Sequence, residues 1–315
     1  MKLTNKHNIP QTFVNVLERP TYNKGKANLS VTQLINSPKI VALTKKFEDE
    51  IEQDVADMVW SIFGSAVHKV LEHGQDENHI VEERLHAEVD GWKISGAIDL
   101  QIVHPDGIDV RDYKTVSAWS VMNEKIEWEQ QLNIYAWLVE TVKKVPVKSL
   151  GIVAIIRDWS RREAARNPDY PQAPIKEIPI FTWGMLERKK LISDRIHAHS
   201  SCEFEIETDG KLPDCTPEEM WEKPTVWAVK KLGGARAKSV HQDYQEALEA
   251  LAKSGRNYEI EVRPGSRTRC ENFCPVNVYC QQWRDYLEVK NERVQEVADS
   301  KTGAAGKETN QVGQE

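Results

Sequence analysis

Residues 96–114 read GAIDLQIVHPDGIDVRDYK, and this stretch decides the fold. Apolar and polar side chains alternate on both sides of Asp106-Gly107, a dipeptide typical of tight hairpin turns. The alternation predicts two strands, within residues 92–103 and 107–113. The turn brings these strands alongside each other, so polar residues on one strand can approach polar residues on the other.

The polar residues of this hairpin are expected to meet two residues that come later in the chain. Side chains two apart on a strand share a face, so Asp112 and Lys114 project together. The hairpin allows Asp99 to approach Asp112. Gln131 and Tyr135 are four apart in a stretch with helical periodicity, so one helix face carries both. We therefore expect these five side chains to form one site.

The residue types in this group suit phosphodiester hydrolysis. That reaction needs an activated water and stabilisation of charge on the phosphoryl oxygens. Carboxylate oxygens hold Mg²⁺ or Mn²⁺, which supply the charge and lower the pKa of bound water. A lysine beside the metal, here Lys114, can orient or deprotonate the water. His68, on a helix expected over residues 55–73, can add a nitrogen ligand, which favours Mn²⁺ over Mg²⁺.

The order of these residues is more informative than any one of them. Alone, a DxK triplet is usually part of a surface strand, and a helix histidine is usually a structural residue. Together the patterns GxxxH, GxxD, DxK and QxxxY resemble the RecB-type branch of the PD-(D/E)XK nuclease superfamily. That branch includes the RecB and AddB nuclease domains, CRISPR-associated RecB-like exonucleases and stand-alone phage exonucleases. The resemblance covers roughly residues 29–285.

The resemblance implies a fold and a role for each matching residue. The fold would be α/β, a restriction-endonuclease-like core with a central mixed sheet flanked by helices, and a C-terminal cysteine-rich subdomain. An outer metal ligand could come from the strand before Asp99, with Glu83 and its neighbour Glu82 competing for that role. The implied metal ligands for Mg²⁺ or Mn²⁺ are His68, Asp99 and Asp112, and the implied catalytic residues are Asp99, Asp112, Lys114, Gln131 and Tyr135.

A second metal site is expected near the C-terminus, where Cys270, Cys274 and Cys280 form a C-x3-C-x5-C cluster. Iron-sulfur members of the family carry a similar trio with a fourth cysteine far upstream, and Ser37 occupies that position here. Cys215 is the natural substitute, because it lies in the same Trp- and Pro-rich segment. Four thiolates suit an iron-sulfur cluster or tetrahedral Zn²⁺, and the sequence leaves both open. Four reduced, unligated cysteines are the plainer alternative.

The composition is that of a soluble globular protein, with 40% hydrophobic and 29% charged residues. We expect a cytoplasmic protein, because the sequence has no membrane-spanning apolar run and no signal-peptide segment at its start. The odd count of five cysteines argues against a disulfide framework, and Cys202 is expected to bind no metal. The net charge of −7 argues against non-specific coating of nucleic acid. Two basic stretches, residues 157–166 and 230–238, face either DNA or only solvent.

The sequence pattern divides the chain into four parts. Helices are expected at about 55–73, 117–143 and 184–199, and strands at about 80–88, 92–103, 107–113, 149–156 and 176–182. The parts are a flexible arm (1–28), the nuclease core (29–209), a Cys- and Trp-rich metal-binding subdomain packing on the core (210–286), and a disordered tail (287–315).

Three functions fit these expectations. The first is a metal-dependent DNA exonuclease of phage or bacterial recombination, repair or degradation, acting on single strands or duplex ends, alone or with a recombination partner protein. The second is a protein with the same fold that holds DNA ends without cleaving them. The third is a trimming factor of the CRISPR-adaptation type. Intact Asp99, Asp112 and Lys114 favour an enzyme over a binding protein.

Overall fold

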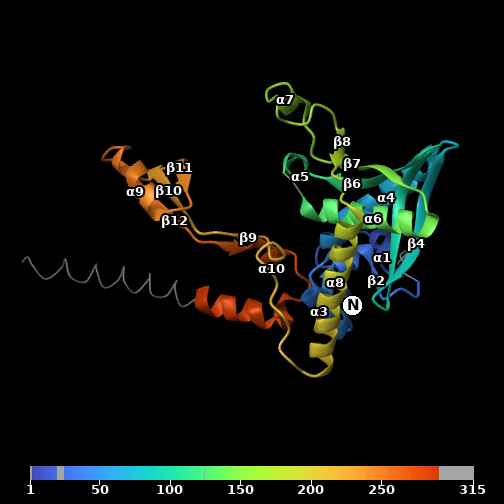
Figure 1. Cartoon of the computed structure of the whole chain (residues 1–315). Coiled ribbons are helices and arrows are strands. Elements are labelled where there is room, and N and C mark those ends of the chain that lie inside the picture. The colour runs from blue at the N-terminus through green and yellow to red at the C-terminus, as the bar shows by residue number, and fades with distance from the viewer. Residues whose placement is uncertain (1, 20–24, 124, 291–315) are drawn as a thin grey trace, which may run out of the picture. The chain divides into compact units, whose positions relative to one another are not determined.

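The structure is a computed structural model in which the chain divides into two compact units, residues 1–212 and 213–315 (Figure 1). Each unit is described by itself. The predicted packing of residues 210–286 on the core stays a prediction. Of the predicted disordered tail (287–315), residues 287–290 are helical and residues 291–315 lie outside the described residues. The described residues are 2–19, 25–123 and 125–290.

A mixed six-stranded sheet forms the centre of the first unit, in the order β2-β5-β6-β7-β8, with β4 also paired to β5. The expected central mixed sheet flanked by helices is therefore confirmed. β2 pairs with β5 and β6 with β7 in parallel, whereas the other neighbours are antiparallel. The strands are β2 (Leu29–Ser30), β4 (His79–Val89), β5 (Trp92–His104), β6 (Gly107–Val116), β7 (Val147–Ile156) and β8 (Ile175–Ile180).

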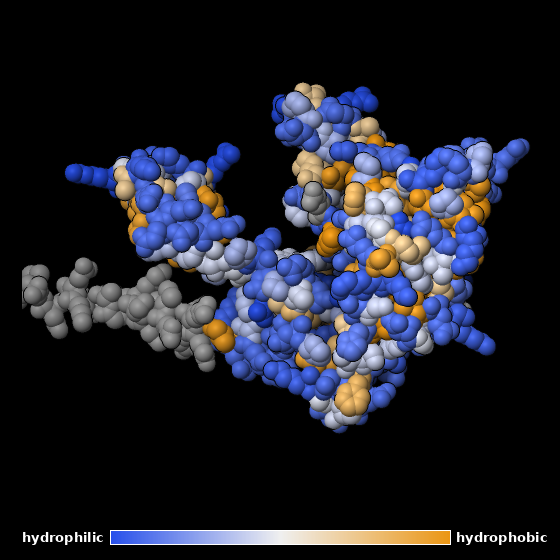
Figure 2. Space-filling model, in the orientation of Figure 1, coloured by the Kyte–Doolittle hydropathy of each residue, from blue (hydrophilic) through white to orange (hydrophobic). Residues whose placement is uncertain are grey.

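The helix α4 (Val55–Leu71) matches the helix expected over residues 55–73, but its apolar side chains do not form a core. Val55 is its one buried residue, whereas Trp60 is 55% and Val70 70% exposed. In Figure 2, hydrophobic residues, in orange, lie exposed among hydrophilic ones on the face that is shown. Helical spacing of apolar residues thus predicted the helix correctly but not what it contacts.

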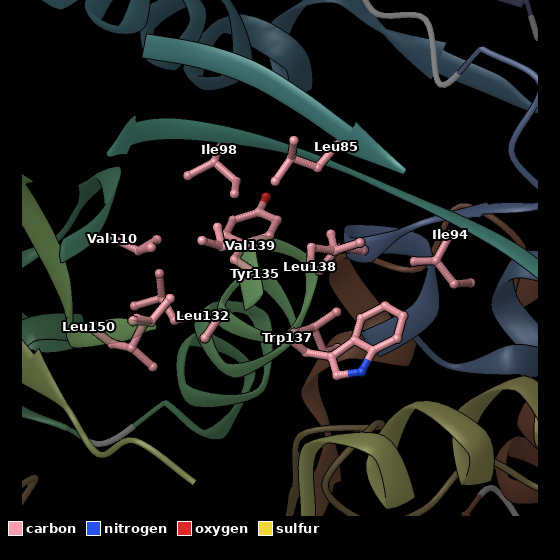
Figure 3. Packing of buried hydrophobic residues seen from close by; sticks show 14 of the residues in the cluster. Leu85, Ile94, Ile98, Val110, Leu132, Tyr135, Trp137, Leu138, Val139 and Leu150 are labelled. Atoms are coloured by element: carbon pink, nitrogen blue, oxygen red, sulfur yellow. The ribbon is translucent and has the colours of Figure 1, made fainter. Parts of the chain in front are cut away.

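The helix α6 (Ile126–Lys143) carries most of the core, because every residue from Gln131 to Val139 is buried. It contacts β4, β5, β6 and β7, and also α2 (Val31–Ile35) and α8 (Met185–Glu207). In Figure 3, Tyr135 of α6 points towards Ile98 and Leu85 of the sheet, and Trp137 points away from them. The polar residues of α6 that face the sheet are therefore held in a rigid apolar setting.

Gly96 of β5 allows α6 to approach the sheet. A Cβ atom at this position would lie 2.7 Å from Leu138 Cδ1 and 2.9 Å from Tyr135 Cε1. Both neighbours belong to well-packed buried side chains, so any residue larger than glycine would push α6 away. The glycine that opens the GxxD pattern therefore sets the distance between α6 and the strand that carries Asp99.

The stretch 117–143, expected as one helix, forms two helices instead. α5 (Ala118–Met122) is capped by the Ser117 side chain, and Asn123 then adopts an extended backbone with φ −126° and ψ 133°. The Asn123 side chain donates a hydrogen bond to the Trp119 carbonyl at 2.7 Å, which satisfies the C-terminal end of α5. At its other end, α5 begins almost directly after β6, with only Ser117 between the two elements.

Residues 1–28, expected to be a flexible arm, contain regular structure. β1 (Lys2–Thr4) pairs in parallel with β3 (Glu52–Asp54), and α1 (Gln11–Leu17) contacts α4. Sequence periodicity missed these elements because each is short and α1 buries only Val14. The remaining helices of the first unit are α3 (Pro38–Lys46), which has the buried Ser37 at its N-cap, the 3-10 turn η1 (Glu72–Gly74), and α7 (Arg161–Ala164).

The second unit is built from small elements. Its three-stranded antiparallel sheet has the order β11-β10-β12 and contacts α9. None of the described helices in either unit has both the length and the apolar composition that spanning a bilayer requires. The elements are β9 (Glu222–Lys223), β10 (Val226–Lys231), β11 (Ala237–His241), α9 (Tyr244–Ala252), β12 (Tyr258–Arg263), β13 (Ser266–Arg267), α10 (Thr268–Asn272), η2 (Asn277–Tyr279) and a helical stretch at 281–290.

Candidate active site

The site lies where β5 and β6 separate. Their antiparallel pairing runs from His104↔Gly107 to Leu100↔Arg111 and then stops. Beyond this point the Asp99 side chain takes the place of a backbone acceptor. Its Oδ2 accepts a hydrogen bond from the Tyr113 N–H at 2.8 Å. The fork in the sheet thus brings Asp99, which is 7% exposed, next to the strand segment that carries the DxK triplet.

Asp112 is held from two sides. Gln131 Nε2 of α6 donates to Asp112 Oδ1 at 3.0 Å and also to the Tyr135 hydroxyl at 2.9 Å. Lys114 Nζ lies 2.5 Å from Asp112 Oδ2 as an ion pair. That oxygen is nevertheless buried without a hydrogen bond of normal geometry, so it keeps a free lone pair. The structure therefore brings the five predicted side chains of the fork and α6 to one place.

His68 of α4 completes the group from the helix side. Its Nε2 lies 3.1 Å from the Tyr113 carbonyl oxygen, which can only accept, so this nitrogen carries the proton. Its Nδ1 then faces two carboxylates, at 3.4 Å from Glu82 Oε1 and 3.5 Å from Asp99 Oδ1. A neutral imidazole in this tautomer presents a lone pair to the acidic cluster, as a metal ligand must.

Glu82, and not Glu83, joins the site. The register of β4 against β5 places Glu82 opposite Asp99, between the pairs Val81↔Leu100 and Glu83↔Ile98. Glu82 has a left-handed backbone with φ 50°, which an L-residue rarely adopts in a strand and which is typical of functional sites. Glu83 accepts a hydrogen bond from Gln101 at 2.7 Å and pairs with Lys143. Cross-strand register with Asp99 is the signal that separates the two glutamates.

The residues present fit a divalent cation. One ligand atom from each of His68, Glu82 and Asp99 lies within 4.8 Å of the others, and the buried Asp112 carboxylate lies on the adjoining strand β6. Carboxylate oxygens with one imidazole are a donor set for Mg²⁺ or Mn²⁺. Among the described residues, no other group of histidine, cysteine and acidic side chains is as close.

Comparison with known families agrees with this geometry. The family model of the PD-(D/E)XK nuclease superfamily matches residues 65–281. The chain belongs to the PD-(D/E)XK nuclease superfamily. The matched range contains every residue of the fork site and also Cys215, Cys270, Cys274 and Cys280.

The solved structures similar to this nuclease-family chain are distant. The protein SSO0001 is 19% identical with a TM-score of 0.41, and the match covers 63% of this chain and 88% of that one. A candidate exonuclease from Eubacterium rectale is 12% identical with a TM-score of 0.27, and the match covers 65% of this chain and 76% of that one. No curated protein matches the sequence.

The electrostatics of this PD-(D/E)XK site favour a bound cation. Burial, and then the neighbouring Asp112 carboxylate, raise the pKa of Asp99 to about 7. The Glu82 carboxylate raises the pKa of His68, with Asp99 and Asp112 contributing less. Both shifts favour the protonated form of the side chain, and a bound cation would compete with these protons.

We expect Asp99→Asn to stabilise the metal-free protein at neutral and alkaline pH. The folded-state pKa lies above the ordinary value of 3.8, so the wild-type folded state binds a proton that the unfolded chain has lost. The free energy of unfolding of the wild type is unaffected by this difference in pKa below pH 4, where Asp99 is protonated in both states. It falls as the pH rises to about 7, because the unfolded chain loses its proton at a lower pH than the folded one. Asparagine removes the penalty and keeps an acceptor for Tyr113, so the free energy of unfolding at pH 8 should rise by on the order of 2–4 kcal/mol.

Urea unfolding in EDTA at pH 5 and pH 8 measures this difference. The difference in the free energy of unfolding between Asp99→Asn and wild type should be larger at pH 8 than at pH 5. A variant no more stable than wild type at pH 8 would show that the Asp99 carboxylate is not destabilised by its surroundings.

The cysteines divide between the two units. Cys202 is buried in α8 of the first unit, whereas the other four lie in the second. Cys215 is tied to the helical stretch after Cys280, because Gln282 bonds both its N–H, at 2.9 Å, and its carbonyl, at 3.0 Å. Burial, and then the neighbouring Cys274, Cys215 and Cys280, raise the pKa of Cys270 to about 11. The structure thus brings the four thiols close enough to act on one another.

Proposed function

We propose that the chain is a divalent-metal-dependent deoxyribonuclease of the RecB-type branch that acts on DNA ends as an exonuclease. The observation that carries the proposal is the meeting of Asp99, Asp112 and Lys114 at the fork between β5 and β6. A protein that only holds DNA gains nothing from burying two carboxylates that repel each other. A role in phage or bacterial DNA recombination, repair or degradation belongs to the same proposal and rests on the order of the motifs.

His68, Glu82, Asp99 and Asp112 would hold the cation, Mg²⁺ or Mn²⁺. When bound, the cation lowers the pKa of a water molecule and offsets negative charge on the phosphoryl oxygens. Asp112 has Oδ1 fixed by Gln131 and Oδ2 paired with Lys114, so its carboxylate is held in place for this purpose. His68 is fixed in turn by the Tyr113 carbonyl, so the ligand set is organised before the cation arrives.

Lys114 is the residue that would contact the reacting groups. Its ammonium is held at 2.5 Å by Asp112, yet its side chain remains 25% exposed. From there it can donate a hydrogen bond to the attacking water or to a phosphoryl oxygen, and stabilise the charge that develops in the transition state. Gln131 and Tyr135 are each 5% exposed behind Asp112, so we assign them as positioning residues that act through that carboxylate.

We expect His68→Ala to weaken cleavage more in Mg²⁺ than in Mn²⁺. Mg²⁺ demands near-ideal octahedral coordination and loses water slowly, whereas Mn²⁺ tolerates a missing nitrogen ligand better. Initial rates at several concentrations of each metal measure the change, with His73→Ala on the neighbouring exposed turn as control. An unchanged rate and metal preference would make His68 a structural helix residue.

End-labelled linear duplex, linear single strand and covalently closed circular DNA, each with Mg²⁺, Mn²⁺ or EDTA, test the proposed activity. The linear substrates should be shortened from their ends, the closed circles should stay intact, and EDTA should stop the reaction. Cleavage of closed circles would replace exonuclease by endonuclease. Binding of ends without cleavage in either metal would favour the end-binding or trimming-factor alternatives.

We further propose that Cys215, Cys270, Cys274 and Cys280 bind one metal centre that organises the second unit. The mutual effect of the four thiols on the pKa of Cys270 supports this. Four thiolates suit either tetrahedral Zn²⁺ or an iron-sulfur cluster. The resemblance of the C-terminal trio to that of iron-sulfur members of the family favours the cluster.

A further inference from the structure

We propose that exposed aromatic rings beside the fork, two of them stacked with a basic side chain, form a binding track for the bases of single-stranded DNA. This proposal rests on the proposed nuclease function and specifies that the site binds single-stranded DNA. The track consists of Trp60 and Phe63 of α4, Trp119 of α5, and the cations Arg157 and Lys125.

The rings of the track are large and exposed. Trp60 is 55%, Phe63 43% and Trp119 59% exposed. Trp60 and Phe63 meet edge to face, with ring centroids 6.1 Å apart. A helix as apolar as α4 that buries only Val55 offers its surface to something outside the described core.

The two basic side chains lie on the faces of two of these rings. The Arg157 guanidinium lies 4.5 Å from the centroid of Trp60, and Lys125 Nζ lies 4.6 Å from the centroid of Trp119. Within the part of the chain that the structure describes, neither cation forms an ion pair with a carboxylate. Their charge is therefore available for phosphate, unlike that of Lys230 in the other basic stretch, which pairs with Glu259 and Glu261.

Backbone contacts tie these residues to the fork. β6 and β7 run in parallel, with Lys114 opposite Ala154 and Val116 opposite Ile156, so both strands end at the same edge of the sheet. Past that edge, the Arg157 N–H bonds the Val116 carbonyl at 2.9 Å. The Ala118 N–H bonds Asp158 Oδ1 at 2.7 Å, which fixes the start of α5. Figure 1 shows α5 and the α7 segment emerging at this end of the sheet.

The helix α4, which carries Trp60 and Phe63, also carries the proposed cation ligand His68. Trp60 precedes His68 by two turns of α4, a distance of about 12 Å along the helix axis, or about two nucleotides of extended strand. Trp119 follows Lys114 by five residues. A strand lying on the rings is thereby within reach of the fork.

Single-stranded DNA is the occupant that this chemistry fits. Exposed rings stack on bases, and base stacking is available only where the bases are not already stacked within a duplex. Basic groups among the rings match the phosphates that alternate with those bases. A second copy of this chain would match the apolar surface but would lack the alternation of flat bases and phosphates that the rings and the two cations match.

Binding without cleavage tests the proposal. Fluorescence anisotropy with labelled dT20, a dT20 analogue whose central nucleotides are abasic, and a 20-base-pair duplex would be measured in EDTA. The full chain is used as wild type, Trp60→Ala, Trp119→Ala and the double variant. Phe204→Ala, which removes a ring that is 62% exposed on α8, is the matched control.

Each tryptophan variant should bind dT20 about 10-fold more weakly than wild type, and the double variant more weakly still. On the abasic analogue the variants should differ little from wild type, and Phe204→Ala should match wild type on every ligand. Trp60→Phe should recover part of the loss, because it keeps a ring. Thermal unfolding of each variant separates loss of fold from loss of stacking.

Three outcomes would overturn the track. They are unchanged dT20 binding by the double variant, equal losses on intact and abasic strands, and conversion of an oligomer to a monomer by Trp60→Ala in sedimentation. Failure of the nuclease proposal looks different: wild type binds dT20 through the rings but shortens no DNA in Mg²⁺ or Mn²⁺. If wild type cleaves DNA but loss of the rings does not change binding, the track proposal is wrong and the nuclease proposal stands.

Discussion

Replacing Asp112 by alanine is expected to lower the rate of DNA cleavage by about 10²–10³-fold. The change removes a buried proposed cation ligand, and with it the carboxylate that holds Lys114 at 2.5 Å. Two groups that act on the transition state are therefore lost together. Lys114→Ala and Asp99→Ala should fall in the same range, because residues that act as one unit are not additive.

Single-turnover cleavage of an end-labelled strand at saturating Mg²⁺ measures this loss. Asp109→Asn is a matched control on the same strand, since Asp109 bonds Ser149 at 2.7 Å and His104 at 3.0 Å instead of facing the fork. The control should cleave at nearly the wild-type rate. Full activity in Asp112→Ala would refute the assignment of the fork as the active site.

The hairpin and the DxK triplet could be predicted from sequence because their geometry is local. A period of two on a strand places Asp112 and Lys114 together, and a tight turn fixes which strand lies beside them. The ladder from Leu100↔Arg111 to His104↔Gly107 has the expected form. Local rules also placed Gln131 and Tyr135 on one face of a helix, where Gln131 now bonds both Asp112 and Tyr135.

Other features depend on contacts that no local rule contains. The choice between Glu82 and Glu83 depends on the register of β4 against β5 and on a left-handed backbone at Glu82. The apolar spacing over residues 55–73 predicted a helix, and α4 forms there, yet most of its apolar residues are not buried. Periodicity reports that a surface is apolar, not whether protein, DNA or solvent meets it. The break between α5 and α6 lies at Asn123, whose backbone is extended and whose side chain bonds the Trp119 carbonyl.

The four cysteines of the second unit give the other large expected effect. Replacing any one of Cys215, Cys270, Cys274 and Cys280 by serine should remove the metal centre, because a thiolate ligand is lost from a set of four. The raised pKa of Cys270, about 11, favours the protonated thiol, so metal binding is expected to release its proton. The centre should therefore be lost as a whole.

Elemental analysis and visible absorption of anaerobically purified protein identify the centre as iron-sulfur or zinc. Wild type should carry one centre per chain, and the four variants should carry almost none. The control is Cys202→Ser, whose sulfur is buried in α8 of the first unit and should not affect the metal content.

Limited proteolysis extends this test to the fold of the second unit. Its sheet is small and its elements are short, so the metal is expected to supply much of its stability, and the four variants should be cut early within residues 213–290. If Cys215→Ser keeps a full complement of metal, the fourth ligand lies elsewhere and Ser37 or Cys202 becomes the candidate. If wild type carries no metal when purified anaerobically, the four thiols are reduced and unligated, and the second unit is stable without them.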